Sequence, residues 1–173
     1  MTEYFTPIPF PLWSEDKQAF ADALGRSFRE TGFAVISQHP IPQKVIQDNL
    51  AATKAFFAQP EPVKLQYDGR EGGGQRGYTA FGVENAKGKA EADQKEFWHT
   101  GRLLPADSPY RATMAETPAV AEVRDFDRAT HAMYDAMDAF GRQLLKAVAL
   151  HLKLDEDWFE DKVNVGNSIL RLL

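Results

Sequence analysis

The sequence contains no cysteine among its 173 residues. It therefore has no disulfide framework, no thiol nucleophile and no thiolate metal site. No apolar run approaches the ~20 residues that a membrane-spanning helix needs. The N-terminus shows no basic segment followed by an apolar one, the pattern of a secretory signal. We therefore expect a cytoplasmic protein with no membrane partner.

A basic surface is also missing, because 25 acidic residues outnumber 20 basic ones and give a net charge of -5. Nucleic-acid-binding domains carry the opposite charge, so we expect no nucleic-acid partner. Glycine (12) and proline (10) occur at ordinary frequency, which excludes collagen-like and low-complexity classes. The hydrophobic content of 43% is that of a globular chain long enough for one domain.

Apolar periodicity and turn residues predict a mixed helical and strand (α+β) fold. Prolines alternating with large apolar residues over 1–13 favour an extended edge segment. Ser14 is placed to cap a helix that ends at Gly32. In order, the other expected elements are a strand at 33–37, a helix from Pro42 to Phe57, a glycine-rich loop at 68–77, a strand at 95–100, a long helix at 120–152 and a strand at 168–173.

The helix expected over 120–152 carries an apolar stripe at helical spacing. We expect this stripe to pack against a β-sheet that lies mostly downstream in the sequence. Its members are Phe126, Met133, Met137, Phe140 and Leu144.

The residues 168–173 are apolar and compatible with a strand. An apolar strand needs partners, because an exposed apolar edge promotes aggregation. We expect a sheet whose other strands lie further on; the alternative is a small sheet formed within these 173 residues.

Gly72, Gly74 and Gly77 satisfy the pattern G-x-G-x-x-G. The dinucleotide-binding motif requires a strand before these glycines and a helix that opens within them. Residues 62–67 do not read as such a strand, and the aromatic Tyr78 follows. The pattern therefore favours a loop over a dinucleotide site.

The four histidines do not form a recognisable metal-binding motif. None is followed by an acid two positions later, so no H-x-D pair is present. His131 and His151 lie on the same expected helix about 200° apart, so they cannot share a metal. We interpret His39, His99, His131 and His151 as surface residues or as supports of a nearby site, and we assign no metal ligand and no catalytic residue.

Four blocks of sequence, taken together, carry a family resemblance. They are GFAVI at 32–36 with HPIP at 39–42, FFAQP at 56–60 with VK at 63–64, GYTAFG at 77–82 with KG at 87–88 and KEFWH at 95–99, and NSILRLL at 167–173. In this order they resemble the N-terminal half of isopenicillin N synthase-like oxygenases, which depend on iron(II) and mostly on 2-oxoglutarate. One departure is Gln-His-Pro at 38–40, where the family usually has Asn-His-Gly.

The resemblance implies that residues 1–166 form the N-terminal oxygenase region, with helices, a few strands and a long backing helix. Residues 167–173 would begin a core strand of a double-stranded β-helix (jelly roll) that lies mostly beyond the chain end. In the family that barrel carries H-x-D, a distant His and an Arg-x-Ser, which bind iron(II) and 2-oxoglutarate. The 173 residues alone should therefore be inactive, and the C-terminal half would be their main packing partner.

The implied activity is hydroxylation or oxidative ring chemistry on a small molecule. Two other classes stay open from the residues: a non-catalytic scaffold or interaction module that is complete in itself, and an unrelated enzyme such as a dinucleotide oxidoreductase.

The resemblance also suggests substrate-binding residues. Tyr78 and Thr79 follow the glycine-rich loop, and Trp98 aligns beside them in the family; packing in an aromatic core is the alternative for Tyr78 and Trp98. Side chains alternate along a strand, so Ile169, Arg171 and Leu173 should share one face. The family's Y-P-P tyrosine would lie on the same face and point into the barrel. We therefore expect Arg171 to bind a substrate carboxylate or similar group. The alternatives are a structural ion pair with an acid from the C-terminal half and, if the register shifts by one residue, an outward-facing arginine.

Overall fold

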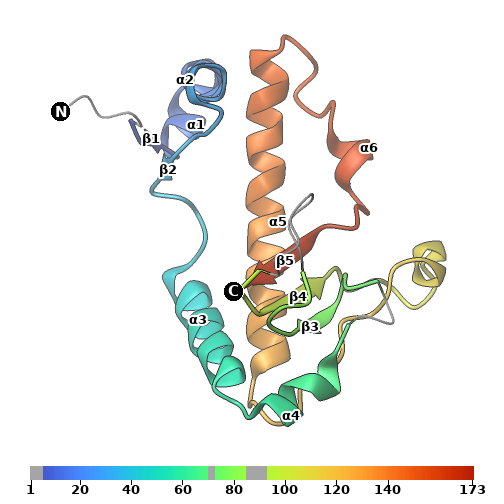
Figure 1. Ribbon diagram of the computed structural model, residues 1–173. Coiled ribbons are helices and arrows are strands. Elements are labelled where there is room, and N and C mark those ends of the chain that lie inside the picture. Colours follow the sequence, from blue (N-terminus) through green and yellow to red (C-terminus); the bar gives the residue numbers. More distant parts are fainter. Residues whose placement is uncertain (1–5, 70–72, 85–92) are drawn as a thin grey trace. The chain divides into compact units, whose positions relative to one another are not determined.

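The computed structural model describes residues 6–69, 73–84 and 93–173. These residues belong to two compact bodies, and Figure 1 labels the helices and strands that form them. The N-terminal body comprises Met1–Pro42 and Ala136–Gly166, and the sheet body comprises Gln43–Asp135 and Asn167–Leu173. The predicted mixture of helices and strands is therefore confirmed.

The N-terminal body combines a short parallel sheet with helices. The proline-rich segment forms strand β1, as predicted, and the second strand is shorter than the expected 33–37. The elements of this body are β1 (Ile8–Pro9), α1 (Leu12–Glu15), α2 (Lys17–Thr31), β2 (Ile36–Ser37), the part of α5 from Ala136 onward and α6 (Glu160–Val163).

Helix α2 ends where the sequence predicts but begins with a different cap. Gly32 terminates it with φ +77°, a conformation that glycine adopts without steric cost. At the other end Asp16 is the cap, since its carboxylate accepts a hydrogen bond from the Ala19 amide at 2.9 Å. The prediction of Ser14 as the cap is wrong, because Ser14 lies inside the separate helix α1.

Replacing Asp16 with alanine is expected to lower the free energy of unfolding by about 1 kcal/mol, because one amide at the start of α2 loses its acceptor. Chemical denaturation measures this change. Asp16→Asn should retain most of the stability, and equal losses for the two variants would contradict the capping role.

The core of the N-terminal body gathers residues from α2, the β1 segment and α5. Phe10 meets both Phe20 and Phe140 edge to face, with ring centroids 5.8 and 5.3 Å apart. Phe140 therefore contacts the N-terminal segment, whereas its predicted partner was a β-sheet. Met137 of the same stripe is exposed. The fully buried members are Phe20, Ala21, Leu24 and Ala147.

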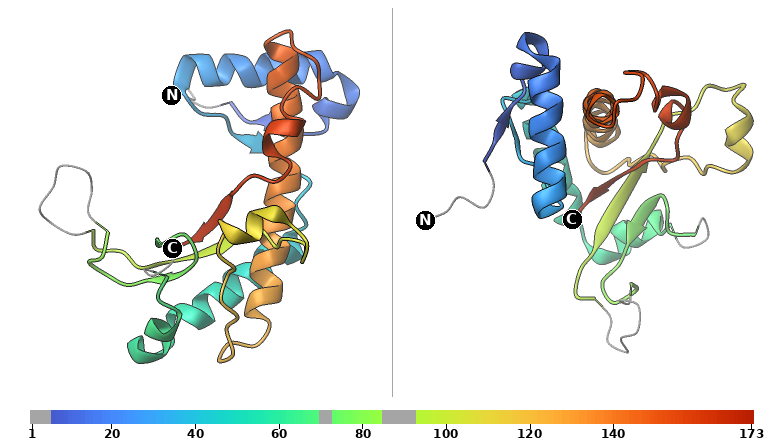
Figure 2. Two further views of the ribbon diagram at one scale, coloured as in Figure 1. Left: turned by 90° about the vertical axis from the view of Figure 1, so that its right-hand side faces the viewer. Right: turned by 90° about the horizontal axis from the view of Figure 1, so that it is seen from above.

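The sheet body is built around an antiparallel sheet in the order β3-β4-β5. Figure 2 shows β4 between its two neighbours. The elements are α3 (Gln43–Phe57), α4 (Glu61–Lys64), the 3-10 turns Leu65–Tyr67 and Pro109–Ala112, β3 (Gly77–Thr79), β4 (Phe97–Gly101), α5 (Phe126–His151) up to Asp135, and β5 (Ile169–Leu172).

Strand β5 finds its partner within this chain. Trp98 to Gly101 of β4 pair with Leu172 to Ile169 of β5. The sequence predicts that the partner strands of this strand lie further on in the sequence. This prediction is wrong for one edge of β5, because that edge pairs with β4 of this chain. Strands β3 and β4 are short and separated by a long connection, which makes this sheet difficult to recognise from sequence.

The core of the sheet body is aromatic. Phe56 of α3, Trp98 of β4 and Phe126 of α5 lie with ring centroids 4.9 to 5.0 Å apart. Tyr78 and Leu172 belong to the same buried cluster. At Phe126 the stripe does pack on the sheet, as predicted.

Helix α5 begins at Phe126, six residues later than the predicted start at Val120. Asp125 has a φ of +62°, which is incompatible with a continuous helix through this point. The Asp127 carboxylate instead accepts a hydrogen bond from the Val120 amide at 3.0 Å. Val120 and Val123 are buried nevertheless, because they pack from a loop.

Candidate functional site

The three-stranded sheet has two chemically different faces. Residues directly opposite each other on antiparallel strands project to the same side. Tyr78, Trp98 and Leu172 are such partners and form the core face. The second face carries Thr79 opposite Phe97, and His99 opposite both Gly77 and Arg171. The four predicted substrate-binding residues are therefore divided, with Arg171 and Thr79 on the second face and Tyr78 and Trp98 on the core face.

The core-face residues pack as the aromatic-core alternative describes. Trp98 is fully buried, and its indole N–H donates to Thr100 Oγ1 at 3.0 Å. Tyr78 is equally buried, and its hydroxyl donates to Glu96 Oε2 at 2.5 Å. Burial, and then this hydrogen bond, raise the pKa of Tyr78 above its ordinary range. In this arrangement neither ring is accessible to a substrate, so any effect on substrate choice would be indirect.

The second face carries a group that we call the Arg171 cluster: Glu84, Phe97, His99 and Arg171. His99 and Arg171 are directly opposite on β4 and β5, and Phe97 lies two residues before His99. The Arg171 guanidinium carbon lies 4.3 Å from the Phe97 ring centroid. Arg171 Nη2 lies 3.4 Å from Glu84 Oε1. The alternation that predicts Arg171 on the face opposite to Leu172 is confirmed.

His99 connects Arg171 to the glycine-rich loop. Its Nδ1 lies 2.8 Å from the Gly74 carbonyl oxygen, and Arg171 Nε donates to its Nε2 at 2.7 Å. A carbonyl only accepts, so Nδ1 carries the proton and Nε2 provides a lone pair. Burial, followed in size by the charges of Arg171 and Arg76 among the lowering effects, holds the pKa of His99 below its ordinary value. His99 is therefore neutral near pH 7.

Arg171 retains capacity for a further anionic partner. Its side chain is 40% exposed, and among the described residues its Nη1 makes no hydrogen bond. Its acidic neighbour Glu84 is shared with Lys95, whose Nζ lies 2.8 Å from Glu84 Oε2. Hydrogen bonding to Lys95, and secondarily the charge of Arg171, lower the pKa of Glu84. A planar guanidinium with a free edge is suited to a carboxylate.

A second arginine fastens the loop to the start of β5. Arg76 is only 4% exposed, and it donates to the Gln75 carbonyl at 2.7 Å and to Asn167 Oδ1 at 2.5 Å. Asn167 in turn donates to the Gln75 side chain at 2.9 Å. A Cβ at Gly101 would lie 1.9 Å from Arg76 Nε, so a larger residue at this strand position would displace the Arg76 guanidinium.

Sequence reasoning missed His99 and Glu84 as parts of this group. From the sequence, His99 is interpreted as a surface or supporting histidine, and the structure assigns it the supporting position. The strand register would have paired it with Arg171, but the register of β5 on β4 cannot be read from the sequence.

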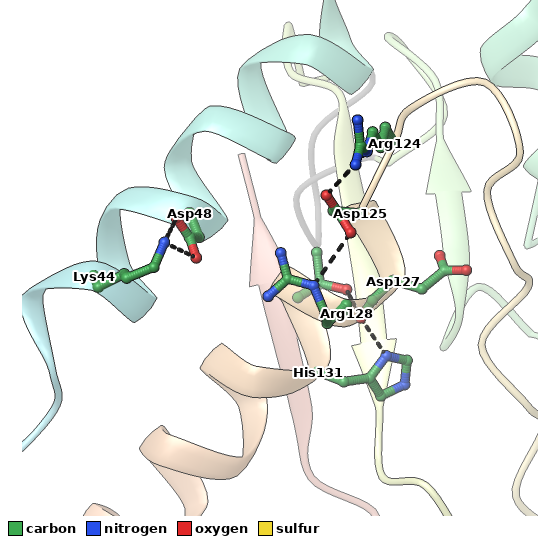
Figure 3. A network of polar contacts seen from close by, with 8 residues as sticks. Lys44, Asp48, Arg124, Asp125, Asp127, Arg128 and His131 are labelled. Atoms are coloured by element: carbon green, nitrogen blue, oxygen red, sulfur yellow. Dashed lines mark hydrogen bonds and ion pairs between the residues drawn. The ribbon is translucent and has the colours of Figure 1, made fainter.

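Elsewhere, the described residues contain no group of three or more His, Asp or Glu that could hold a metal ion. His131 donates to the Asp127 carbonyl one helical turn earlier, at 2.8 Å (Figure 3). The neighbouring pairs Lys44–Asp48 and Asp125–Arg128 are local and lie at the surface. His151 lies between Asp22 and Arg29, and His39 lies beside Phe140.

The dinucleotide interpretation also fails in the structure. Gly77 opens strand β3, where the motif requires a helix. Gly72, like Lys87 and Gly88 of the family blocks, lies outside the described residues. Among the described helices, none has the length and apolarity to cross a membrane.

Residues 8–121 match the family model DIOX_N, described as non-haem dioxygenase in morphine synthesis N-terminal. This match covers more than half of the chain. The fold and the family model thus define an oxygenase N-terminal region, and the chain belongs to the DIOX_N family, the N-terminal part of the 2OG-Fe(II) oxygenases.

Similarity to individual proteins supports this family membership. Proline hydroxylase buaE of Petromyces alliaceus is 30% identical over 162 residues, which are 90% of this chain and 49% of that protein. A 2OG-Fe(II) oxygenase family protein from Caulobacter crescentus superposes with a TM-score of 0.89 at 44% identity, over 96% of this chain and 54% of that one. A full-length Neurospora crassa protein in complex with alpha-KG matches with a TM-score of 0.81 at 24% identity, over 99% and 55%, and supports the fold alone. The chain spans about half the length of these relatives.

Proposed function

We propose that the protein carrying this chain is an iron(II)- and 2-oxoglutarate-dependent oxygenase that oxidises a small molecule. The observation that carries this proposal is the DIOX_N match together with the 44% identity to a 2OG-Fe(II) oxygenase family structure. Family membership favours this function over a self-contained scaffold and over a dinucleotide enzyme. The overall reaction would convert substrate C–H, 2-oxoglutarate and O2 into C–OH, succinate and CO2.

The residues that this chain contains indicate which role it would have in the whole protein. Residues 1–166 would be the N-terminal region, and 167–173 would begin the core of a jelly roll formed with the remaining half of the protein. In the family the iron is held by an H-x-D pair and a distant His on the barrel, and this sequence contains no H-x-D pair, so we assign the iron to residues outside this chain. Bound iron(II) would supply oxygen activation, and no step of that chemistry is assigned to a residue of this chain.

Within this protein, the Arg171 cluster would bind an anionic group of the substrate. Its support is the partly exposed guanidinium, which His99 and Phe97 hold in place and whose Nη1 makes no hydrogen bond to the part of the chain that the structure describes. Binding a carboxylate there would orient the substrate before oxidation. Thr79 shares this face and would border the same site, while Tyr78 and Trp98 would support it from the core.

The substrate class that fits this guanidinium is a small carboxylic acid, including amino acids. Proline hydroxylase buaE is named for such a substrate, since proline carries a carboxylate. L-proline and its neutral analogue L-prolinamide are therefore a suitable first pair of probes. They differ in the group that Arg171 would bind.

The test is succinate formation from 2-oxoglutarate by the protein that carries this chain. We expect succinate only with iron(II) present, and complete loss of turnover on chelation. Residues 1–173 alone should form no succinate and should bind no iron(II) stoichiometrically. Stoichiometric binding by this chain, abolished by mutating one of its four histidines, would contradict the assignment of the metal to other residues.

A further inference from the structure

His99 is a buried residue whose ring is held by contacts on several sides. It is 5% exposed, and both of its ring nitrogens are engaged, one by the Gly74 carbonyl and the other by Arg171. Its ring also packs on Phe97 with centroids 4.7 Å apart. These two hydrogen bonds and the ring contact therefore fix the orientation of the imidazole.

The orientation of Arg171 depends on this ring. Its other polar contact among the described residues is Glu84, at the longer distance of 3.4 Å, and Phe97 contacts the guanidinium through its π face, which does not fix the rotation of the plane. The Nε–H bond to His99 at 2.7 Å is the contact that fixes the guanidinium plane. With Nε held, the edge that carries Nη1 is left for a ligand.

The tautomer of His99 is determined by the loop. The Gly74 carbonyl requires a proton on Nδ1, which leaves the Nε2 lone pair for Arg171. Three charged groups face the ring from neighbouring elements: Arg171 on β5, Arg76 just before β3 and Glu84 just after it. Two of the three are cations, so a second proton on the ring would be repelled.

We propose that His99 is a positioning residue that holds the Arg171 guanidinium ready for the anionic group of the substrate, and that it does so only as the neutral Nδ1–H tautomer. This inference deepens the proposed function and rests on it for the identity of the ligand. The contact itself is a property of this chain alone.

Protonation would break the arrangement. An imidazolium has no lone pair, so it cannot accept from Arg171 Nε, and it adds a cation beside two arginines. Because the pKa of His99 is lowered, this happens only as the pH falls below the ordinary histidine value of about 6.5. Above that value the contact is retained, and Arg171 is released once the pH falls far enough below it to protonate His99.

Two variants separate the roles of the two nitrogens. In His99→Gln the side-chain oxygen can replace Nε2 as the acceptor for Arg171, and this group does not titrate. In His99→Asn the amide can replace Nδ1 as the donor to Gly74, and the acceptor for Arg171 is lost. Thermal melting of both variants checks that the fold is retained.

The direct measurement is NMR of the protein that carries this chain, with arginine side chains labelled at Nε and with histidine rings labelled. We expect the wild type to show, at pH 7.5, an Arg171 Nε–H resonance shifted by the hydrogen bond to His99, and this resonance should move to the position of a water-exposed arginine as His99 titrates. His99→Gln should keep this signal at low pH, and His99→Asn should lack it at every pH. A wild-type signal that does not change while His99 titrates would overturn the proposal.

The functional measurement is the KM for L-proline in 2-oxoglutarate turnover. We expect an increase of about tenfold in His99→Asn, corresponding to one charge-assisted hydrogen bond, with kcat and the KM for 2-oxoglutarate unchanged. The wild-type KM should rise at low pH relative to that of His99→Gln. A KM that falls at low pH would mean that the imidazolium itself binds the anion, which contradicts positioning. Absence of any 2-oxoglutarate turnover would refute the proposed function and leave the NMR result standing.

Discussion

Replacing Glu96 with leucine is expected to lower the free energy of unfolding by about 3–5 kcal/mol. The Lys64 ammonium lies 2.6 Å from Glu96 Oε2, and the Lys64 side chain is only 9% exposed. The Tyr78 hydroxyl donates to the same carboxylate oxygen. Without Glu96, the Tyr78 hydroxyl loses its acceptor, and the buried Lys64 ammonium keeps only a longer hydrogen bond to the Phe57 carbonyl at 3.4 Å. Chemical denaturation of the protein that carries this chain measures the loss.

A matched control is the exposed pair Lys17–Glu156, whose atoms are 2.7 Å apart. Glu156→Leu should cost less than about 1 kcal/mol, because water solvates both charges. The double variant Lys64→Met with Glu96→Leu should recover much of the lost stability, since no charge is left buried. If Glu96→Leu costs no more than the control, then this network does not connect α4 to the sheet as the structure indicates.

Arg171→Leu is expected to raise the KM for L-proline by about 10- to 100-fold, the effect of losing hydrogen bonds to a charged group. Turnover of 2-oxoglutarate without substrate should be unchanged, because Arg171 would bind the substrate and would not bind 2-oxoglutarate. The KM for L-prolinamide should change little, since this analogue has no carboxylate. Steady-state kinetics with both probes measures the difference.

The control for that change is Arg124→Leu, which removes one positive charge from a site where the side chain is 96% exposed. It should alter neither KM. Equal losses for L-proline and L-prolinamide in Arg171→Leu would indicate that Arg171 has a structural role in the sheet, and this outcome would contradict substrate binding.

Local sequence rules predicted much of the fold. They failed where contacts with residues distant in the sequence determine the structure. The C-terminal end of α2 at Gly32 follows from glycine alone. Its N-terminal end was predicted at Ser14, whereas the cap is Asp16 two residues later, a residue type that caps helices equally well. The start of α5 was predicted too early because Val120 and Val123 continue the helical spacing, although both pack from a loop.

The candidate site shows the same limit. Strand alternation alone placed Arg171 on the face opposite to Leu172, and the structure confirms this. Alternation also separates Tyr78 from its neighbour Thr79, so the two could not both face one substrate site. The partners of Arg171 could not be predicted, because His99 precedes it by 72 residues and only the register brings the two together.

The central claim is that this chain belongs to a protein that splits O2 with 2-oxoglutarate as co-substrate. The most direct test is turnover of that protein with iron(II), 2-oxoglutarate and ¹⁸O₂, followed by mass spectrometry of the succinate. We expect one atom of ¹⁸O in the succinate carboxylate formed by decarboxylation, and no succinate without O2. Consumption of 2-oxoglutarate that is independent of O2, or succinate without the label, would contradict the claim.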